Sequence, residues 1–386
     1  MKKSKTILKL IISGYYGFKN AGDEAILSSM VKNIRAKRPQ FDMTVLSANP
    51  LQTSHSYHVK AIHRMKLFQI LKCIANADIF ISGGGGLLQD STGRGLSILY
   101  YLGLILMAKV VRVPVMVYAQ GIGPVKNTFN HLLIRWIFNQ VDLITLRDNQ
   151  SRELLRRIGI DKPAMHVNAD PSFLLKKNNF NEILANIPTL KEFFCGDNQL
   201  IVGISVRRCK GNNDDLKRKF ARISNELIRK YKAKIIFIPF HAGEDVSFSK
   251  EIIELIEKRD QTYLLENNFK PETLITVISR LSFMFGIRLH SIMFSCLMQV
   301  PFIALNYDPK IKNFVNNLEL SKLLIDLEDL SLKSIQKKVE YIIENNKEIK
   351  KLLSAQVRLL KEKANSNNEL LFRLLESGKE SLFLND

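Results

Sequence analysis

The sequence has little cysteine, and its four cysteines are isolated. They stand at Cys73, Cys195, Cys209 and Cys296, and no two of them form a C-x-x-C pair. Zinc sites and redox pairs need closely spaced cysteines, and disulfide-stabilised secreted domains need many of them. The spacing therefore excludes these classes, and it predicts a protein of a reducing compartment without a metal site.

The sequence also lacks a hydrophobic run long enough to cross a bilayer. The apolar stretch at 97–108 ends before Lys109, whereas a transmembrane helix needs about 20 apolar residues. At the start of the chain, Lys9 interrupts the apolar run and no small-residue cleavage site follows, so residues 6–13 fit a β-strand better than a signal peptide. We expect a cytoplasmic protein, at most peripheral at the inner face of the membrane.

Acidic residues are scarce relative to basic ones. Lys and Arg total 57 against 37 Asp and Glu, a formal charge of +20, which attracts nucleic acid, anionic membranes or phosphorylated substrates. Basic patches interleaved with aromatics and known nucleic-acid modules are missing, so we expect no nucleic-acid partner. Many basic residues lie among acidic ones at 214–234 and 331–363, and a solvated helix face is the alternative explanation for them.

The length and the hydrophobic pattern predict two α/β lobes with parallel sheets. A single core rarely extends beyond roughly 250–300 residues, and β-rich runs alternate with helical patterns through both halves of this 386-residue chain. The predicted strands are 6–13, 43–48, 78–82, 114–119, 141–146, 164–168, 200–206, 234–239, 282–286 and 301–305. The predicted helices between them include 63–75, 96–111, 128–139, 149–158, 213–231, 248–258, 270–280 and 289–298. A polar, Pro- and Gly-containing linker is expected at 175–198, which gives domains at 1–176 and 198–330 and closing helices at 331–386 that pack across the lobes.

Glycine-rich loops follow the strands of the first half. The loop Gly14–Glu24 leads into a helix without matching the dinucleotide fingerprint G-x-G-x-x-G, and four glycines at 83–86 follow another strand. Asp23 and Glu24 either cap their helix or contact hydroxyls of an acceptor. The candidate binding residues of these loops are Gly17, Asn20, Asp23, Glu24, Gly84, Gly85, Gln89, Asp90 and Gln120.

Cationic side chains follow strands in both halves. Arg147 ends a strand just before Asp148, a candidate helix N-cap; it either holds an anion or pairs with Asp148 or Asp170. Arg288 and His290 open an apolar helix, where unpaired polar groups are costly. Lys310 follows the strand at 301–305.

The order of these motifs resembles the polysaccharide pyruvyl transferase family. The resemblance rests on Gly14–Glu24, the glycine run with Gln89 and Asp90, Gln120–Pro124, Thr145–Asp148, Ala169–Pro171, Gly286–His290 and Asn306–Lys310. The resemblance spans residues 7 to 320. It is strongest to the branch of the family that acts on precursors of the secondary cell-wall polysaccharides used to anchor surface-layer proteins. Where the family has an Arg-Pro-Trp-like run, this chain has Arg207-Arg208-Cys209.

The resemblance implies a GT-B-like fold of two Rossmann-like lobes with the reaction in the cleft between them. Phosphoenolpyruvate is the implied donor, a lipid-linked saccharide the implied acceptor, and a pyruvyl ketal the implied product, without a cofactor or metal. It places Arg147, His290 and Lys310 at the donor, with Arg207 and Arg288 as further binding residues. Asp23, Glu24 and Asp90 stay open as the base, and an oligomer and peripheral membrane contact also stay open. The rival function is a GT-B glycosyltransferase that uses a nucleotide sugar.

Overall fold

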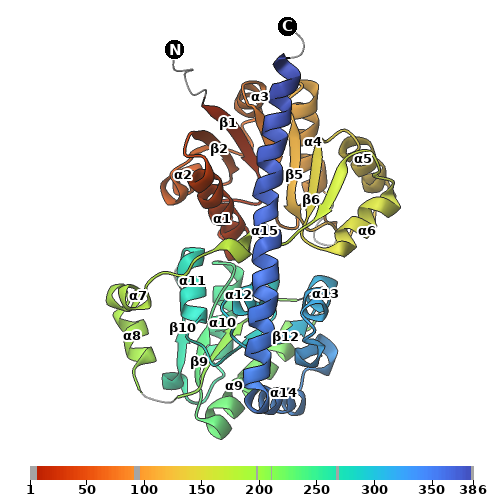
Figure 1. The fold of residues 1–386 in the computed structure, drawn as a ribbon. Coiled ribbons are helices and arrows are strands. Elements are labelled where there is room, and N and C mark those ends of the chain that lie inside the picture. Colours follow the sequence, from red (N-terminus) through yellow and green to blue (C-terminus); the bar gives the residue numbers. More distant parts are fainter. Residues whose placement is uncertain (1–6, 91–95, 197–198, 210, 267–268, 384–386) are drawn as a thin grey trace. The chain divides into compact units, whose positions relative to one another are not determined.

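The computed structural model describes residues 7–90, 96–196, 199–209, 211–266 and 269–383. They form two compact units, coloured along the chain in Figure 1. Unit 1 comprises residues 1–18, 22–175 and 360–386, and unit 2 comprises 19–21 and 176–359. Each unit is built on one parallel β-sheet with helices on both faces.

The sheet of unit 1 has seven parallel strands in the order β3-β2-β1-β4-β5-β6-β7. Its strands are β1 (Leu8–Ser13), β2 (Phe41–Ser47), β3 (Lys60–His63), β4 (Ile79–Ser82), β5 (Val115–Gln120), β6 (Leu143–Leu146) and β7 (Ala164–Val167). The connecting helices are α1 (Ala21–Lys37), α2 (Pro50–Tyr57), α3 (Leu67–Ala75), α4 (Leu96–Val110), α5 (Thr128–Phe138) and α6 (Asn149–Ile158). Strands such as β5 (Val115–Gln120) consist mostly of apolar residues, because a parallel strand is buried on both faces.

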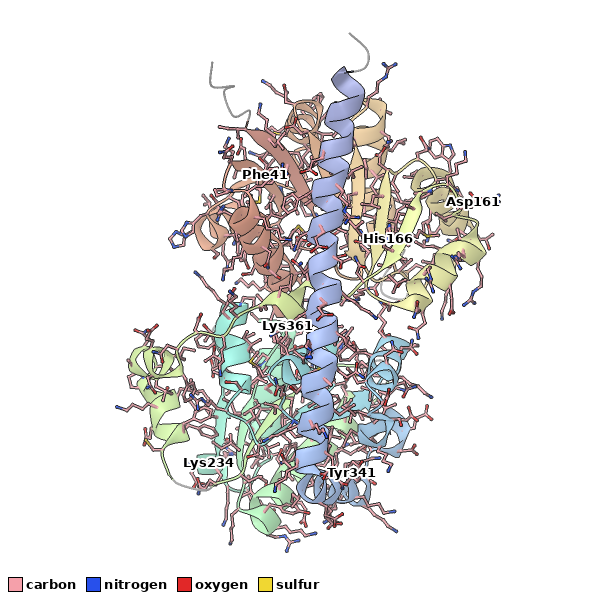
Figure 2. The ribbon with its side chains drawn as sticks, viewed as in Figure 1. Phe41, Asp161, His166, Lys234, Tyr341 and Lys361 are labelled. Carbon is pink, nitrogen blue, oxygen red and sulfur yellow. The ribbon has the colours of Figure 1, made fainter. Side chains whose placement is uncertain are left out.

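Two apolar cores lie on opposite faces of this sheet. One joins the sheet to α3, α4, α5 and α6, and the other joins it to α1 and to Leu371, Phe372 and Leu375 of α15 (Asn346–Phe383). The ring of Phe41, labelled in Figure 2, stacks on Phe372 of α15 with centroids 5.9 Å apart. Asn367 and Asn368 of α15 also hydrogen-bond to Asn168 and Tyr118, so the C-terminal part of α15 belongs to unit 1.

The sheet of unit 2 has six parallel strands in the order β10-β9-β8-β11-β12-β13. They are β8 (Ile201–Ser205), β9 (Lys234–Phe237), β10 (Thr262–Leu264), β11 (Phe283–Gly286), β12 (Phe302–Asn306) and β13 (Leu324–Asp326). The helices are α7 (Phe180–Asn186), α8 (Pro188–Phe194), α9 (Asn213–Tyr231), α10 (Glu244–Ile253), α11 (Pro271–Ile278), α12 (Leu289–Leu297), α13 (Pro309–Asn317), α14 (Leu332–Glu344) and the first turns of α15.

Each strand predicted from the sequence is present, and its ends shift by no more than two residues. The sequence missed β3, β10 and β13 and the helices α2, α7, α8 and α13. The described part of the segment 175–198, predicted as a linker, holds α7 and α8, which begin at an Asn179 cap and at Pro188. Asn and Pro are common at helix starts, so polar composition does not by itself distinguish a linker from short helices.

Candidate functional site

The strand orders locate the crevices where ligands bind in open parallel sheets. Such a crevice forms beyond the carboxyl ends of two neighbouring strands whose connections leave in opposite directions. In unit 1 these strands are β1 and β4, and in unit 2 they are β8 and β11. Most of the sequence-predicted site residues follow these four strands or the strands beside them.

The side chain of Tyr16 fills the crevice in unit 1. Tyr16 is fully buried, and a Cβ atom at Gly14 or Gly83 would lie within 2.4 Å of its side chain. Burial raises the pKa of the Tyr16 hydroxyl well above its usual value, so the phenol stays neutral. Gly14 and Gly83 are therefore required by the packing of the chain's own tyrosine.

The predicted glycines Gly84 and Gly85 pack against α1. A Cβ at Gly84 would lie 2.9 Å from Cγ2 of Ile26, and one at Gly85 would lie 2.6 Å from Oδ1 of the buried Asp23. The glycine run thus lets β4 end close to the first turns of α1. Packing against α1 therefore explains why Gly84 and Gly85 lack side chains. The approach of this loop to a ligand stays a prediction.

Glu24 of α1 links the loop that follows β1 to the end of α2. Its Oε1 accepts a hydrogen bond from the Gly17 N–H at 2.8 Å, and its Oε2 accepts one from the Tyr57 hydroxyl at 2.6 Å. Gly17 has a φ of +80°, and a Cβ there would lie 2.2 Å from Ser47 Oγ. Burial raises the pKa of Glu24, although the two hydrogen bonds oppose the shift. A carboxyl with a raised pKa is suited to proton transfer near neutral pH.

Asp90 is held as a structural carboxylate. Its oxygens accept hydrogen bonds from the N–H groups of Lys126 and Asn127 and from the Asn130 amide, at the start of α5. Burial acts to raise its pKa, but the donors from Asn127 and Lys126 outweigh it and keep the pKa of Asp90 below its usual value. Of the three carboxylates left open as a base, Glu24 therefore fits that role better than Asp90.

A first prediction concerns Glu24 and pH. A carboxyl with a raised pKa in the folded state binds protons more tightly there, so the free energy of unfolding falls as pH rises from about 4.3 through the raised pKa. Glutamine at this position keeps an acceptor for Gly17 and removes the titration. We expect Glu24→Gln to gain stability relative to wild type as pH increases, measured by urea unfolding between about pH 4 and pH 8. The control is Glu153→Gln, at an exposed glutamate of α6; a parallel gain in this variant would contradict the assignment.

Gln120 is fully buried at the end of β5. Its Nε2 donates to Ser82 Oγ at 2.8 Å and to the Gly83 carbonyl at 3.0 Å, which fixes the end of β4. Its Oε1 has no hydrogen-bond partner in the described part of the chain. Gln89 is half-buried in the loop after β4. Gln120 thus has a clear structural role, with one acceptor atom left over.

Arg147 forms the ion pair that the sequence left as an alternative. Its Nη1 lies 2.9 Å from Oδ2 of Asp170, and its Nε lies 3.9 Å from Asp148, whose side chain caps α6 as predicted. The side chain of Arg147 is 6% exposed and that of Asp170 is 0% exposed. Gly121 faces the guanidinium, because a Cβ there would lie 2.5 Å from Nε. Arg147 therefore contributes to the folding of unit 1, whatever it binds.

Arg288 and Asp245 organise the corresponding crevice in unit 2. Arg288, directly after β11, donates to both oxygens of the fully buried Asp245 at the start of α10. Asp245 Oδ2 also accepts the N–H groups of Phe240 and His241, at 3.1 and 2.9 Å. One carboxylate thus fixes the loops that follow β9 and β11.

Arg207 comes from the neighbouring strand β8. Its guanidinium donates to the Tyr307 hydroxyl and lies 4.7 Å from the centre of that ring, beyond the end of β12. Burial raises the pKa of Tyr307, and the charges of Arg207 and Arg288 oppose the shift. The same two arginines oppose the burial that raises the pKa of Cys209. Arg207 and Arg288 therefore place two guanidinium groups near the ends of β8, β11 and β12. We call this the positive region, although Asp245 balances the charge of Arg288.

The N-terminus of α12 opens into this positive region without a side-chain cap. Its N-cap residue is Arg288, whose side chain forms no capping hydrogen bond. His290 is the second residue of α12, half-buried with its ring edge toward Phe294. Lys310 occupies the first turn of α13, capped by Asp308. Amide groups at a helix start and nearby arginines form a site for an anion.

His241 is a candidate that the sequence reasoning missed. It follows β9, and its buried Nδ1 has no hydrogen-bond partner in the described residues. Asn20, predicted to bind substrate, forms a backbone bridge with His241, and Ala21 and Ala242 hydrogen-bond to Phe240 and Lys19 on either side. The position of His241 at the end of a strand beside the crevice could have identified it.

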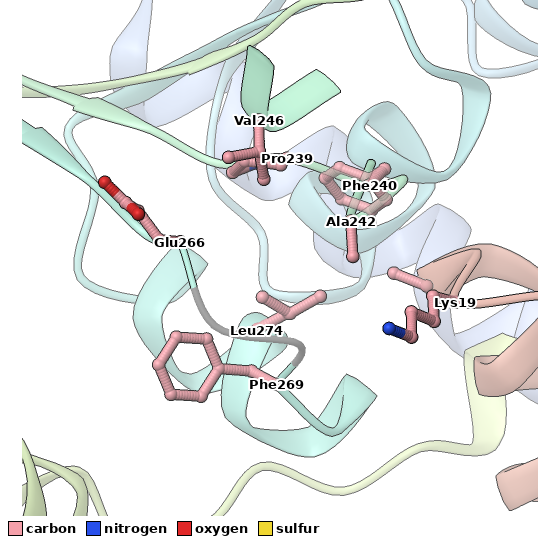
Figure 3. A pocket seen from close by; sticks show the side chains of 9 residues that line it. Lys19, Pro239, Phe240, Ala242, Val246, Glu266, Phe269 and Leu274 are labelled. Atoms are coloured by element: carbon pink, nitrogen blue, oxygen red, sulfur yellow. The ribbon is translucent and has the colours of Figure 1, made fainter. Parts of the chain in front are cut away.

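A small pocket lies beside the backbone bridge between Asn20 and His241. Lys19, Phe240, Ala242, Val246, Glu266 and Leu274 contribute to its lining, with Lys19 and Glu266 at opposite ends (Figure 3). The lining is largely apolar and includes none of Arg207, Arg288 and His290. This pocket is therefore distinct from the positive region.

Comparison with known proteins agrees with this architecture. The chain is 20% identical to the amylovoran biosynthesis protein AmsJ of Erwinia amylovora over 403 residues, covering 91% of this chain and 95% of that protein. A UDP-GlcNAc 2-epimerase of Neisseria meningitidis, solved with UDP-GlcNAc, has a TM-score of 0.63 at 14% identity, covering 95% and 100% of the two chains. Anabaena HepE, solved with UDP-glucose, also has a TM-score of 0.63, at 13% identity over 96% and 100%. These likenesses show the GT-B-type fold that the sequence predicted.

The sequence model of one family covers most of the chain. It describes polysaccharide pyruvyl transferases and matches residues 20–309. The matched region includes β2 to β12 and extends from Asn20 to the start of α13. The chain belongs to the polysaccharide pyruvyl transferase family.

Proposed function

We propose that the protein transfers a pyruvyl group from phosphoenolpyruvate to two hydroxyls of one sugar and releases phosphate. The acceptor in this proposal is a lipid-linked saccharide precursor of a cell-wall polysaccharide, of the kind that anchors surface-layer proteins. Family membership supports a transferase acting on polysaccharide, and the relative from Erwinia amylovora takes part in amylovoran biosynthesis.

The observation that carries the proposal is the uncapped start of α12 beside two arginines. Phosphoenolpyruvate presents a phosphate and a carboxylate on one small frame, so its site needs several fixed donors. The first-turn amides of α12, Arg207 and Arg288 supply such donors within unit 2. His290 and Lys310 lie in the first turns of α12 and α13, at the same edge of the sheet.

The proposed reaction has three steps. A proton adds to the methylene carbon of phosphoenolpyruvate, and one sugar hydroxyl attacks C2. The second hydroxyl then displaces phosphate from C2, which yields the ketal and inorganic phosphate. We assign to His290 the role of the acid, or of the cation that holds the departing phosphate. We assign Arg147 and Lys310 to the anionic groups of the donor, and Glu24 to the sugar hydroxyls.

A nucleotide-sugar glycosyltransferase is the second candidate. Its support is the fold, because structures with TM-scores above 0.6 were solved with UDP-GlcNAc or UDP-glucose. An uncapped helix start with two arginines also suits a diphosphate. The two functions differ in the donor that the protein binds.

The second prediction separates these candidates by ligand binding and turnover. A ligand of the folded state at 100 times its Kd stabilises the protein by about 2.7 kcal/mol. We expect phosphoenolpyruvate to raise the thermal midpoint and UDP to leave it unchanged. With synthetic lipid-linked disaccharides we expect release of phosphate and a matching mass gain on the sugar. Stabilisation by UDP alone, with sugar transfer from a UDP-sugar, would replace the proposal by the second candidate.

A further inference from the structure

One face of unit 1 exposes an unusual amount of apolar surface. The adjacent helices α3, α4 and α5 cover the sheet on the face opposite to α1. Apolar side chains also occupy the outer side of these helices. They are Leu67, Phe68 and Leu71 of α3, Leu99 and Val110 of α4, and Phe129, Leu132 and Trp136 of α5. We call these eight residues the apolar face.

The helix at the centre of this layer is apolar on every side. Ile98, Leu102 and Ile105 of α4 are buried in the core, as expected. The stripe on its other side consists of Leu99, Gly103, Leu106 and Val110, and Val110 is 72% exposed. A helix that is apolar all round normally lies inside a protein or against lipid. The outer side of α4 therefore has the composition of a covered surface.

Aromatic side chains flank α4 on both neighbouring helices. Phe68 of α3 is 90% exposed, and Trp136 of α5 is 57% exposed. Phe129, Leu132 and Trp136 are spaced by three and four residues, so they share one side of α5. Tryptophan and phenylalanine at a surface rimmed by polar residues are typical of membrane-interface contacts.

Basic residues predominate along the helices of the apolar face. The segments 64–76, 96–113 and 125–141 contain seven Lys or Arg residues and no Asp or Glu. Lys109 pairs with Asp142 of the next strand, and Arg64 lies 4.2 Å from the centre of the Tyr100 ring. The rim of the face thus attracts an anionic partner and repels a second copy of itself.

We propose that the apolar face docks onto an anionic lipid surface. Phe68, Phe129, Leu132 and Trp136 enter the interface between headgroups and acyl chains, and the surrounding Lys and Arg residues contact lipid phosphates. None of the helices formed by the described residues combines the length and the hydropathy that a membrane span requires. The surface is separate from the residues assigned to the reaction, and its test does not depend on the substrate.

The protein carries its own probe for this contact, because Trp136 is its only tryptophan. With phosphatidylglycerol vesicles we expect the emission of Trp136 to shift to shorter wavelength and to be quenched by brominated lipid. With phosphatidylcholine vesicles we expect little change, and raised salt weakens the response because it screens the attraction. Unchanged Trp136 emission with saturating phosphatidylglycerol vesicles would overturn the proposal.

A pair of matched variants locates the contact. Phe129→Asp/Leu132→Asp places two charges on the apolar face at exposed positions, and we expect vesicle partitioning to weaken by about tenfold or more. Leu51→Asp/Ile343→Asp makes the same charge change at exposed positions elsewhere and is expected to bind as wild type does. Circular dichroism checks that both fold. Equal loss in both variants would contradict the assigned face. A wild-type dimer that the first variant dissociates, without vesicle binding, would assign the face to a second copy.

Discussion

Replacing His290 with alanine is expected to lower the rate of phosphate release from phosphoenolpyruvate by about 10²–10⁴-fold, with little change in stability. The side chain lies in the first turn of α12, close to the N-cap residue Arg288, whose side chain leaves the first-turn amides uncapped. It is half-buried, and its ring makes an edge contact with Phe294. Loss of the imidazole therefore removes a proton donor and leaves the packing of α12 largely intact.

The measurement is acceptor-dependent phosphate release, with thermal unfolding recorded on the same samples. His166→Ala is the matched control, because His166 is an exposed residue of β7 (Figure 2) and is expected to retain wild-type turnover. His241→Ala is informative as a comparison, since its Nδ1 is buried at the same edge of the sheet. Turnover of His290→Ala within a few-fold of wild type would remove His290 from the mechanism.

The central strands of both sheets could be predicted because a strand that is buried on both faces has a nearly continuous apolar sequence. The strands that were missed lie at sheet edges. β3, β10 and β13 have the sequences KAIH, TYL and LID, and most of their residues are partly exposed. A strand with one neighbour needs less apolar sequence, so its signal resembles that of a loop.

The loops of the candidate site could also be located from the sequence, since parallel strands direct their ends to one edge. The partners within those loops could not. Asp170 lies 23 residues beyond Arg147, and Asp245 lies 43 residues before Arg288. Sequence reasoning did name Asp170 as an alternative partner of Arg147, but it gave no sign that Asp245 or His241 matters. Pairings at such separations depend on the register and order of the strands.

The glycine run illustrates the same limit. Four consecutive glycines predict close approach of something to the end of β4. For Gly83, Gly84 and Gly85 the structure identifies the neighbours as Tyr16, Ile26 and Asp23 of the same chain. A sequence shows that space is needed at such a position, and only the fold shows what occupies it.

Arg147→Ala is expected to destabilise unit 1 by about 3–5 kcal/mol, because it leaves the carboxylate of Asp170 buried without its cation. The measurement is chemical unfolding, compared with Arg157→Ala at an exposed arginine of α6, which is expected to change the stability by less than about 0.5 kcal/mol. A loss of stability no larger than that of the control would show that the ion pair contributes little.

A second variant separates the structural role of Arg147 from a role at the donor. Arg147→Met/Asp170→Asn removes both charges together, and asparagine can still accept the hydrogen bond that Asp170 receives from the Ser172 N–H. Replacing both members of a buried pair costs much less than removing one, so we expect the double variant to be more stable than Arg147→Ala. If Arg147 binds phosphoenolpyruvate, the double variant stays inactive although it is folded. If its turnover recovers along with its stability, Arg147 acts only by holding the end of β6 against Asp170.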